Sequence, residues 1–180
     1  MLAYSSVSHA GYLLIALVAF NGELEGPSAN GIFFYSLAYS VATVAAFGVL
    51  KLVADARQRE DYNGLNGLAR TNPLLAFVMT VAMLSLAGIP LTGGFFGKFF
   101  VFSAAVENGY IGLVVFAVVM SMVSIYYYLR PIIAMYMRPA EDEATATPVP
   151  VTTFQSGALL LLALLTVVLG VLPGLVSGIL

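Results

Sequence analysis

Five apolar stretches separated by short polar segments run along the chain, and each is long enough to predict a membrane helix. A helix that spans a bilayer needs about 20 predominantly apolar residues. The predicted fold is therefore an all-α integral membrane bundle of five transmembrane helices. The stretches that meet the requirement are Leu2–Phe20, Gly31–Leu50, Pro73–Val106, Tyr110–Tyr136 and Phe154–Leu172.

The third stretch is too long for one straight span. As a continuous helix, Pro73–Val106 would be about 50 Å long, against a hydrocarbon core of roughly 30 Å. Helix-breaking residues concentrate near its middle, in the segment GIPLTGGFFG. We therefore expect a discontinuous helix, because proline removes a backbone donor and glycine weakens a helix. The predicted break lies at Gly88, Pro90, Gly93, Gly94 and Gly97.

Basic residues mark the predicted loops on one side of the membrane. Six of the seven Lys and Arg residues lie in the second and fourth loops or at adjoining helix ends. The positive-inside rule places these loops in the cytoplasm, so the chain starts inside and ends outside. Residues 1–138 are predicted to hold four helices, 139–153 a polar cytoplasmic linker, and 154–180 a peripheral C-terminal transmembrane helix.

Composition supports the membrane class and excludes several kinds of function. The chain is 61% hydrophobic and 9% charged, against roughly 25% charged residues in an average soluble domain. A net charge of −2 gives no indication of nucleic-acid binding. With no cysteine and a single histidine, the chain has no thiolates for an iron–sulfur cluster and no histidine pair for a haem. We expect no metal and no cofactor site in it.

Lys98 is the one Lys or Arg residue inside a predicted span and away from the loops, since Arg130 lies near the end of the fourth span. A charged lysine at the bilayer centre costs about 2.5–3.5 kcal/mol on insertion scales and is functional by default. Beside a helix break it would face backbone dipoles and water, which suggests a switchable proton carrier; static pairing is the alternative. All nine acidic residues lie in predicted loops or at the end of the third stretch. A partner must therefore be water, a further part of a larger protein, or another subunit.

Polar side chains recur at helical spacing on three of the predicted helices. Such residues often hold membrane helices together, and this alternative stays open. His9 differs, because the ordinary pKa of imidazole, near 6.5, suits it to accept and release protons. Together, His9 and Lys98 suggest a proton relay to which the recurring polar side chains would belong. The remaining members are Ser5, Ser8 and Tyr12 on the first helix, Ser36, Tyr39, Ser40 and Thr43 on the second, and Ser121, Ser124, Tyr127 and Tyr128 on the fourth.

Three segments carry a family resemblance that covers essentially the whole chain. LAYSSVSHAGYLLIAL, NGLARTNPLLAFVMTVAMLSLAGIPLTGGFFGKFFVFSAAV and YYYLRPIIAMYM closely resemble the antiporter-like subunit family of bacterial NADH–quinone oxidoreductase (respiratory complex I). The stretch from His9 to Tyr12 favours the N subunits within this family. The motif around Pro90 and Lys98 is the most specific part of the resemblance.

The resemblance implies a fold of about fourteen helices with two inverted repeats, of which this chain matches the C-terminal part, helices ten to fourteen. Residues 1–138 would be proton-channel helices of the second repeat. Lys98 falls on the lysine of the second broken helix, in the proton-output half-channel, and His9 and Tyr127 fall on polar-axis positions. The first repeat would be missing, and Met1 suits an internal methionine of a truncated reading frame.

The same resemblance implies a proton-translocating membrane subunit without a redox centre of its own. NADH, flavin, iron–sulfur clusters and quinone would belong to other subunits. The partners would be other membrane and peripheral subunits, the lipid bilayer of the bacterial inner membrane, and the missing N-terminal helices. Two alternatives remain: a subunit of a Mrp-type cation/proton antiporter or membrane-bound hydrogenase complex, and a purely structural scaffold. The cost of burying Lys98 argues against the scaffold.

Overall fold

The structure is a computed structural model that describes residues 1–20, 22, 26–59, 61–140 and 143–174. Within these residues all regular elements are helical, as the apolar pattern predicts. Residues 175–180 of the predicted C-terminal segment lie outside the described part. The helices are α1 (Leu2–Val18), α2 (Pro27–Arg57), the 3₁₀ turn η1 (Asn63–Leu65), α3 (Leu68–Thr71), α4 (Pro73–Ala87), α5 (Gly93–Glu107), α6 (Ile111–Met137), α7 (Glu143–Ala146) and α8 (Thr153–Val171).

Local sequence sets the helix ends. Pro27 and Pro73 lie in the first turns of α2 and α4, where a missing N–H costs nothing because that group has no partner within the helix. Thr152 and Gln155 form a reciprocal capping box at the start of α8. At the other end of α2, the helix continues to Arg57, several residues beyond the predicted span, so part of the predicted second loop is helical.

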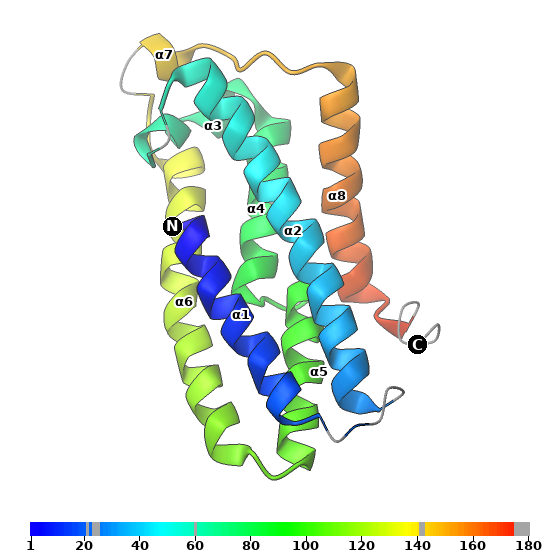
Figure 1. Cartoon of the computed structure of the whole chain (residues 1–180). Helices are drawn as coiled ribbons and strands as arrows, with labels where there is room; N and C mark the ends of the chain where they lie inside the picture. The colour runs from blue at the N-terminus through cyan, green and yellow to red at the C-terminus, as the bar shows by residue number, and fades with distance from the viewer. Residues whose placement is uncertain (21, 23–25, 60, 141–142, 175–180) are drawn as a thin grey trace.

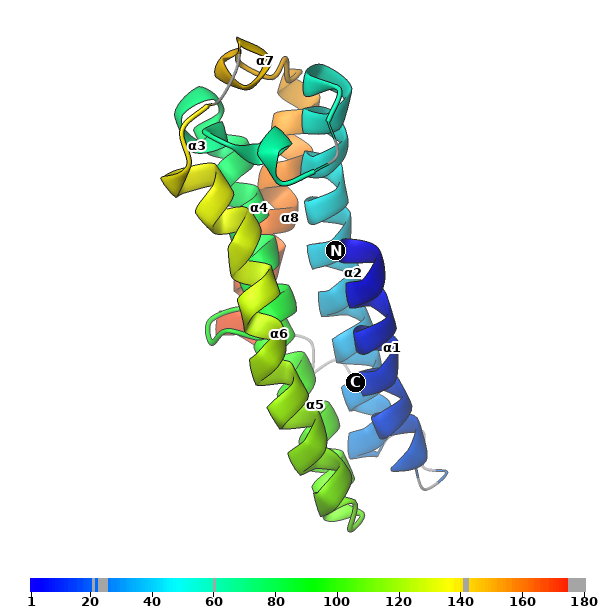
Figure 2. The same cartoon turned by 90° about the vertical axis from the view of Figure 1, so that its left-hand side faces the viewer.

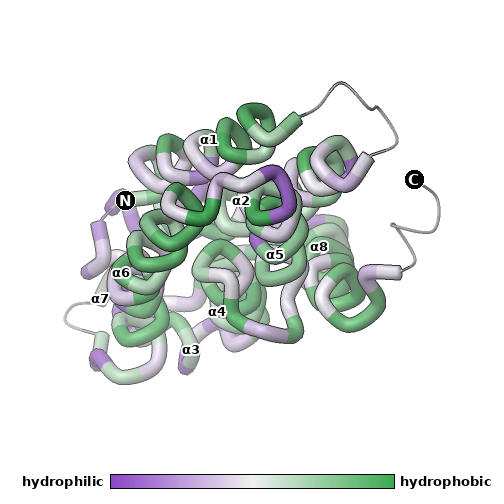
Figure 3. The backbone as a smooth tube through the Cα atoms, turned by 90° about the horizontal axis from the view of Figure 1, so that it is seen from below, coloured by the Kyte–Doolittle hydropathy of each residue, from purple (hydrophilic) through white to green (hydrophobic). Residues whose placement is uncertain are grey.

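The long helices form a bundle with α2 in contact with α1, α4, α5 and α8 (Figures 1 and 2). The face of α2 buried in this bundle is lined by small residues, Ala38, Ala42, Ala45 and Ala46. Small side chains let membrane helices approach closely. Seen along the bundle, apolar positions occur around the outside as well as inside (Figure 3), which is typical of helices that face lipid.

Three described helices are long and apolar enough to cross a membrane: α2, α6 and α8. A fourth span results if residues Asn63–Thr71 and Pro73–Ala87, bent by 120°, are counted together. The helices α1, α4 and α5, of 17, 15 and 15 residues, are shorter. The chain is thus a membrane-spanning helical bundle, and α4 and α5 follow one another along it (Figure 1).

One end of the bundle gathers the C-terminus of α2, the helices α3 and α7, and the N-terminus of α8 (Figure 1). Arg57 orders the connection there by donating to the carbonyl oxygens of Gly64 and Asn66 at 2.8 and 3.1 Å and to the Thr71 hydroxyl at 3.0 Å. Asn72 exchanges two hydrogen bonds with the backbone of Val149, at 2.7 and 2.9 Å. The predicted linker 139–153 is therefore held against the start of α4, and it contains the short helix α7.

Candidate functional site

A short non-helical segment separates α4 from α5. Gly88 ends α4 in the left-handed conformation, with φ of 83°, and α5 begins at Gly93. Leu91 within the segment also has a positive φ, of 73°, an uncommon and strained value for a residue with a side chain. The interruption thus covers residues 88–92 and is narrower than the predicted break, which extended to Gly97.

The glycines that follow the interruption lie inside α5 and have a packing role. A Cβ atom on Gly94 would come within 1.9 Å of the Ser85 carbonyl oxygen, and one on Gly97 within 3.2 Å of the Tyr35 Cα. A Cβ on Gly93 would lie 2.9 Å from the Cβ of Leu169 in α8. These residues therefore allow α4, α2 and α8 to pack directly against the start of α5, where side chains would not fit.

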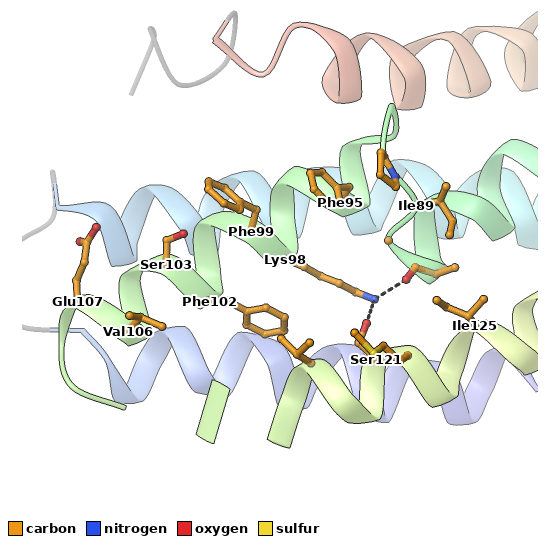
Figure 4. Close-up of a pocket in the computed structure, with 15 residues that line it drawn as sticks. Ile89, Phe95, Lys98, Phe99, Phe102, Ser103, Val106, Glu107, Ser121 and Ile125 are labelled. Carbon is orange, nitrogen blue, oxygen red and sulfur yellow. Dashed lines mark hydrogen bonds between the residues drawn. The ribbon is translucent and has the colours of Figure 1, made fainter. Parts of the chain in front are cut away.

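Lys98 lies in the second turn of α5 and reaches back to the end of α4. Its side chain is 94% buried, with 6% relative exposure. The ammonium nitrogen donates to the Ala87 carbonyl oxygen at 2.9 Å, the Leu86 carbonyl oxygen at 3.3 Å, and the Ser121 hydroxyl at 2.8 Å. Figure 4 shows the bond to Ser121. The three partners come from two elements, α4 and α6, which converge on the lysine.

The interruption between α4 and α5 explains why a cation can lie here. The last carbonyl groups of a helix have no partner within it and form the negative end of its dipole, which attracts cations. By ending α4 at Ala87, the break presents two such carbonyls to Lys98. Among the described residues, no carboxylate forms an ion pair with this lysine. Backbone dipoles and a hydroxyl take its place.

Gly88 is required at this position for two reasons. Its positive φ disfavours any L side chain, and a Cβ there would come within 3.0 Å of the Lys98 Nζ. We expect Gly88→Ala to destabilise the protein by about 1–2 kcal/mol, seen as a lower melting temperature of the purified full-length protein. Gly157→Ala is the matched control, because nothing lies within 4 Å of its added Cβ. Equal melting temperatures for the two variants would contradict the requirement.

A cavity of about 710 Å³ opens beside the lysine, between α5 and α6. Most of its wall is apolar, and the close-up in Figure 4 shows Phe95, Phe99 and Phe102 along it. The polar members are Lys98, Ser103, Ser121 and Glu107. Water bound in the cavity would need these polar groups as partners, because an apolar cavity stays dry.

His9 forms a second buried cluster with residues of α2 and α6. The imidazole is 3% exposed; its Nδ1 lies 2.5 Å from the Tyr35 hydroxyl and its Nε2 lies 2.9 Å from the Tyr128 hydroxyl. Ser5 is hydrogen-bonded to the same Tyr128 hydroxyl. Tyr39 stacks on the imidazole with 4.6 Å between ring centroids. Both ring nitrogens therefore have hydroxyl partners that can donate or accept.

Tyr12 lies between the two clusters. Its ring meets His9 edge-on at 5.9 Å between centroids, and the Lys98 Nζ lies 5.2 Å from the same ring's centroid. That geometry is a cation–π contact. The lysine and the histidine are thus neighbours across a single tyrosine, which brings together residues far apart in the sequence.

The other polar residues predicted from helical spacing are less closely connected to these clusters. Ser36 donates to the Ile32 carbonyl oxygen of its own helix at 2.7 Å, and Ser124 to the Ser121 carbonyl oxygen at 2.5 Å. The Thr43 hydroxyl is buried without a hydrogen-bond partner. Tyr127 is half-buried, with its ring 4.6 Å from that of Tyr128. Two residues are exposed and lie outside the clusters: Ser8 and Ser40.

Spacing alone did not identify Tyr35 or the carbonyls of Leu86 and Ala87. Tyr35 is four residues before Tyr39, so extending the stripe of the second helix by one turn would have included it. The carbonyl groups carry no side-chain signal at all. Within the described residues, no group of three or more His, Cys, Asp or Glu side chains could hold a metal ion.

Residues 1–124 match the family model described as NADH:quinone oxidoreductase/Mrp antiporter, TM. The chain is 44% identical over its whole length to "NADH-quinone oxidoreductase subunit N 2" of Herpetosiphon aurantiacus, and 39% identical over 97% of its length to "NADH-quinone oxidoreductase subunit N" of Bdellovibrio bacteriovorus. It covers 32% and 36% of these two proteins. The chain therefore spans about a third of the length of the curated relatives it matches.

Two solved structures share the fold over 98% of the chain. Respiratory complex I from Thermus thermophilus with bound aureothin contains a chain that is 40% identical, with a TM-score of 0.80 and 38% of that chain covered. The Mrp complex from Dietzia sp. contains one that is 25% identical, also with a TM-score of 0.80 and 41% covered. With a helix interruption, a buried lysine and this sequence match, the chain belongs to the NADH:quinone oxidoreductase/Mrp antiporter transmembrane family.

Proposed function

We propose that this chain is part of a proton-translocating membrane subunit of NADH–quinone oxidoreductase, corresponding to subunit N. The observation that carries the proposal is Lys98, an almost fully buried lysine held by the carbonyls at the end of α4. A buried ionisable group at a helix interruption is the arrangement that membrane transporters use to bind ions. The sequence identity to N subunits supports the same assignment.

The proposed membrane arrangement has five spans: α1, α2, the pair α4 and α5 as one discontinuous helix, α6 and α8. Each of α4 and α5, at 15 residues, is about 22 Å long, so the two together are long enough to cross the core. The basic end with α3 and α7 faces the cytoplasm of a bacterial inner membrane by the positive-inside rule, and residue 174 is on the outer side.

The proposed mechanism is a relay through water, hydroxyl groups and two titratable side chains. His9, hydrogen-bonded to two tyrosine hydroxyls, exchanges protons with Lys98 past Tyr12, and Lys98 exchanges them with water in the adjoining cavity. Electron transfer, with NADH, flavin, iron–sulfur clusters and quinone, takes place in other subunits. Its coupling to Lys98 requires those subunits and the rest of subunit N.

Tyr128 is placed better than Tyr127 to serve this relay, because its hydroxyl contacts both His9 and Ser5. We expect Tyr128→Phe to lower proton translocation by about a hundredfold, the lower end of the 10²–10⁴ that a positioned proton-transfer group typically contributes. Tyr127→Phe is the matched control, on the adjacent residue of the same helix, and is expected to have a much smaller effect. Proton uptake by inverted membrane vesicles measures both. A larger effect of Tyr127→Phe would instead support the position implied by the family resemblance.

A native gel of detergent-solubilised membranes tests the proposed assembly. The intact gene product that contains this sequence, carrying a tag, should migrate with a large band that oxidises NADH. Migration in a smaller assembly without this activity would overturn the proposal in favour of a Mrp-type antiporter, and sodium/proton exchange would then be the assay. The identities of 40% to the complex I chain and 25% to the Mrp chain favour the first outcome.

A further inference from the structure

A second groove, of about 580 Å³, runs between α2 and α8 on the outside of the bundle. Its walls are apolar, and several of the residues that line it are exposed. Phe154 is 84% exposed, Val44 58% and Phe47 45%. Gly48 lies at the floor of the groove, where a Cβ would come within 3.0 Å of the Leu159 side chain of α8. This groove is separate from Lys98 and from the histidine cluster.

One end of the groove is charged. Lys51 and Asp55, one turn apart on α2, line it and pair with each other at 2.9 Å between Nζ and Oδ2. Their side chains are 75% and 64% exposed, so both can turn toward another partner. Gln155 lines the same groove from the first turn of α8. The C-terminus of α2 and the N-terminus of α8 lie at the same end of the molecule (Figure 1).

The length of the groove matches one leaflet of a bilayer. From Thr43 to Asp55, α2 rises about 18 Å, and half of the hydrocarbon core is roughly 15 Å. The groove therefore runs from the polar interface toward the middle of the membrane, with its charged pair at the interface. An acyl chain under a phospholipid head group has this length and this change of polarity.

We propose that the groove binds one phospholipid whose head group carries a phosphate and a primary ammonium, as in phosphatidylethanolamine. Lys51 contacts the phosphate, Asp55 accepts a hydrogen bond from the ammonium, and an acyl chain lies between α2 and α8. The adjacent cation and anion complement such a zwitterion. A choline head group has no N–H to donate to Asp55, and a glycerol head group brings a phosphate but no cation. The proposal stands apart from the proton-translocating function.

Native mass spectrometry of the full-length protein that contains this sequence tests the site. After delipidation, the unmodified protein is expected to retain phosphatidylethanolamine in preference to phosphatidylcholine and phosphatidylglycerol. Lys51→Gln and Asp55→Asn should each lower the retained phosphatidylethanolamine about fivefold, as expected for the loss of one interfacial charge contact. Arg70→Gln is the control, because this exposed cation lies on α3 at the same end of the bundle and does not line the groove.

Equal retention of the three lipids by the unmodified protein would overturn the proposal, and this comparison needs no variant to fold. Unchanged retention in both groove variants would overturn it as well. A photo-crosslinking residue in place of Phe154 gives a third readout in the assembled complex. Crosslinks to phospholipid are expected there, whereas crosslinks to a protein segment in the groove would exclude a lipid.

Discussion

Replacing Lys98 with methionine is expected to reduce proton translocation by about a hundredfold or more while leaving the assembled complex intact. Methionine fills a similar volume but has no proton to exchange, and removing a group that transfers protons typically costs 10²–10⁴ in rate. We expect the buried site to tolerate an apolar side chain, because the Ala87 carbonyl that Lys98 would release borders a cavity in which water can bind. Proton uptake by inverted membrane vesicles, with assembly followed by native gel, measures both effects.

Lys98→Arg separates proton exchange from charge. Arginine keeps a cation that can donate to the end of α4, but it does not lose its proton in proteins. We expect this variant to translocate protons as poorly as Lys98→Met. Retained translocation with arginine would mean that the positive charge alone is needed, and retained translocation with methionine would remove Lys98 from the mechanism.

Among Gly→Ala changes at the described glycines, Gly94→Ala is expected to give the largest loss of stability. The added Cβ would come within 1.9 Å of the Ser85 carbonyl oxygen and 2.7 Å of its carbon. These are backbone atoms, so α4 and α5 would have to move apart. Overpacking typically costs about 1–3 kcal/mol and occasionally more, and we expect a marked fall in melting temperature and in the amount of assembled protein.

Gly112→Ala is the control for this prediction. Gly112 lies in the first turn of α6, and nothing lies within 4 Å of its added Cβ. Alanine has the higher helix propensity, so stability is expected to be unchanged or slightly higher. If Gly94→Ala were as stable as this control, α4 and α5 would not pack as closely as the structure places them.

Apolar length predicted the helical membrane fold, and the concentration of glycine and proline predicted an irregular segment that includes residues 88–92. These signals are local, so a single sequence contains them. The extent of the interruption was less predictable, because glycine both breaks helices and allows close packing. Only the neighbours of Gly94 and Gly97, Ser85 and Tyr35, distinguish the two roles.

Which residues come together in the site could not be predicted from the sequence, because this depends on how the helices pack. The stripes of the first and fourth helices predicted His9 and Tyr128 as separate features, and their contact requires the packing of α1 against α6. The helix α8, predicted to be peripheral, has one face against α2, α4 and α5. A Cβ on its Gly170 would come within 2.3 Å of the Thr92 backbone. Periodicity does not specify such pairs, because it defines faces and not their neighbours.

The number of hydrogens on the Lys98 nitrogen links its protonation state to the hydration of the cavity. An ammonium has three hydrogens, one for each of its acceptors, Leu86, Ala87 and Ser121. A neutral amine has two hydrogens and a lone pair, so all three contacts persist only if the Ser121 hydroxyl turns to donate to that lone pair; otherwise one acceptor loses its donor, and the longest bond, at 3.3 Å to Leu86, is the weakest. In the proposed relay, loss of the proton therefore loosens the hold on the side chain unless the hydroxyl turns, and water that enters beside it can satisfy the freed carbonyl. Each proton that leaves Lys98 in that relay thus favours the hydration through which the next one arrives.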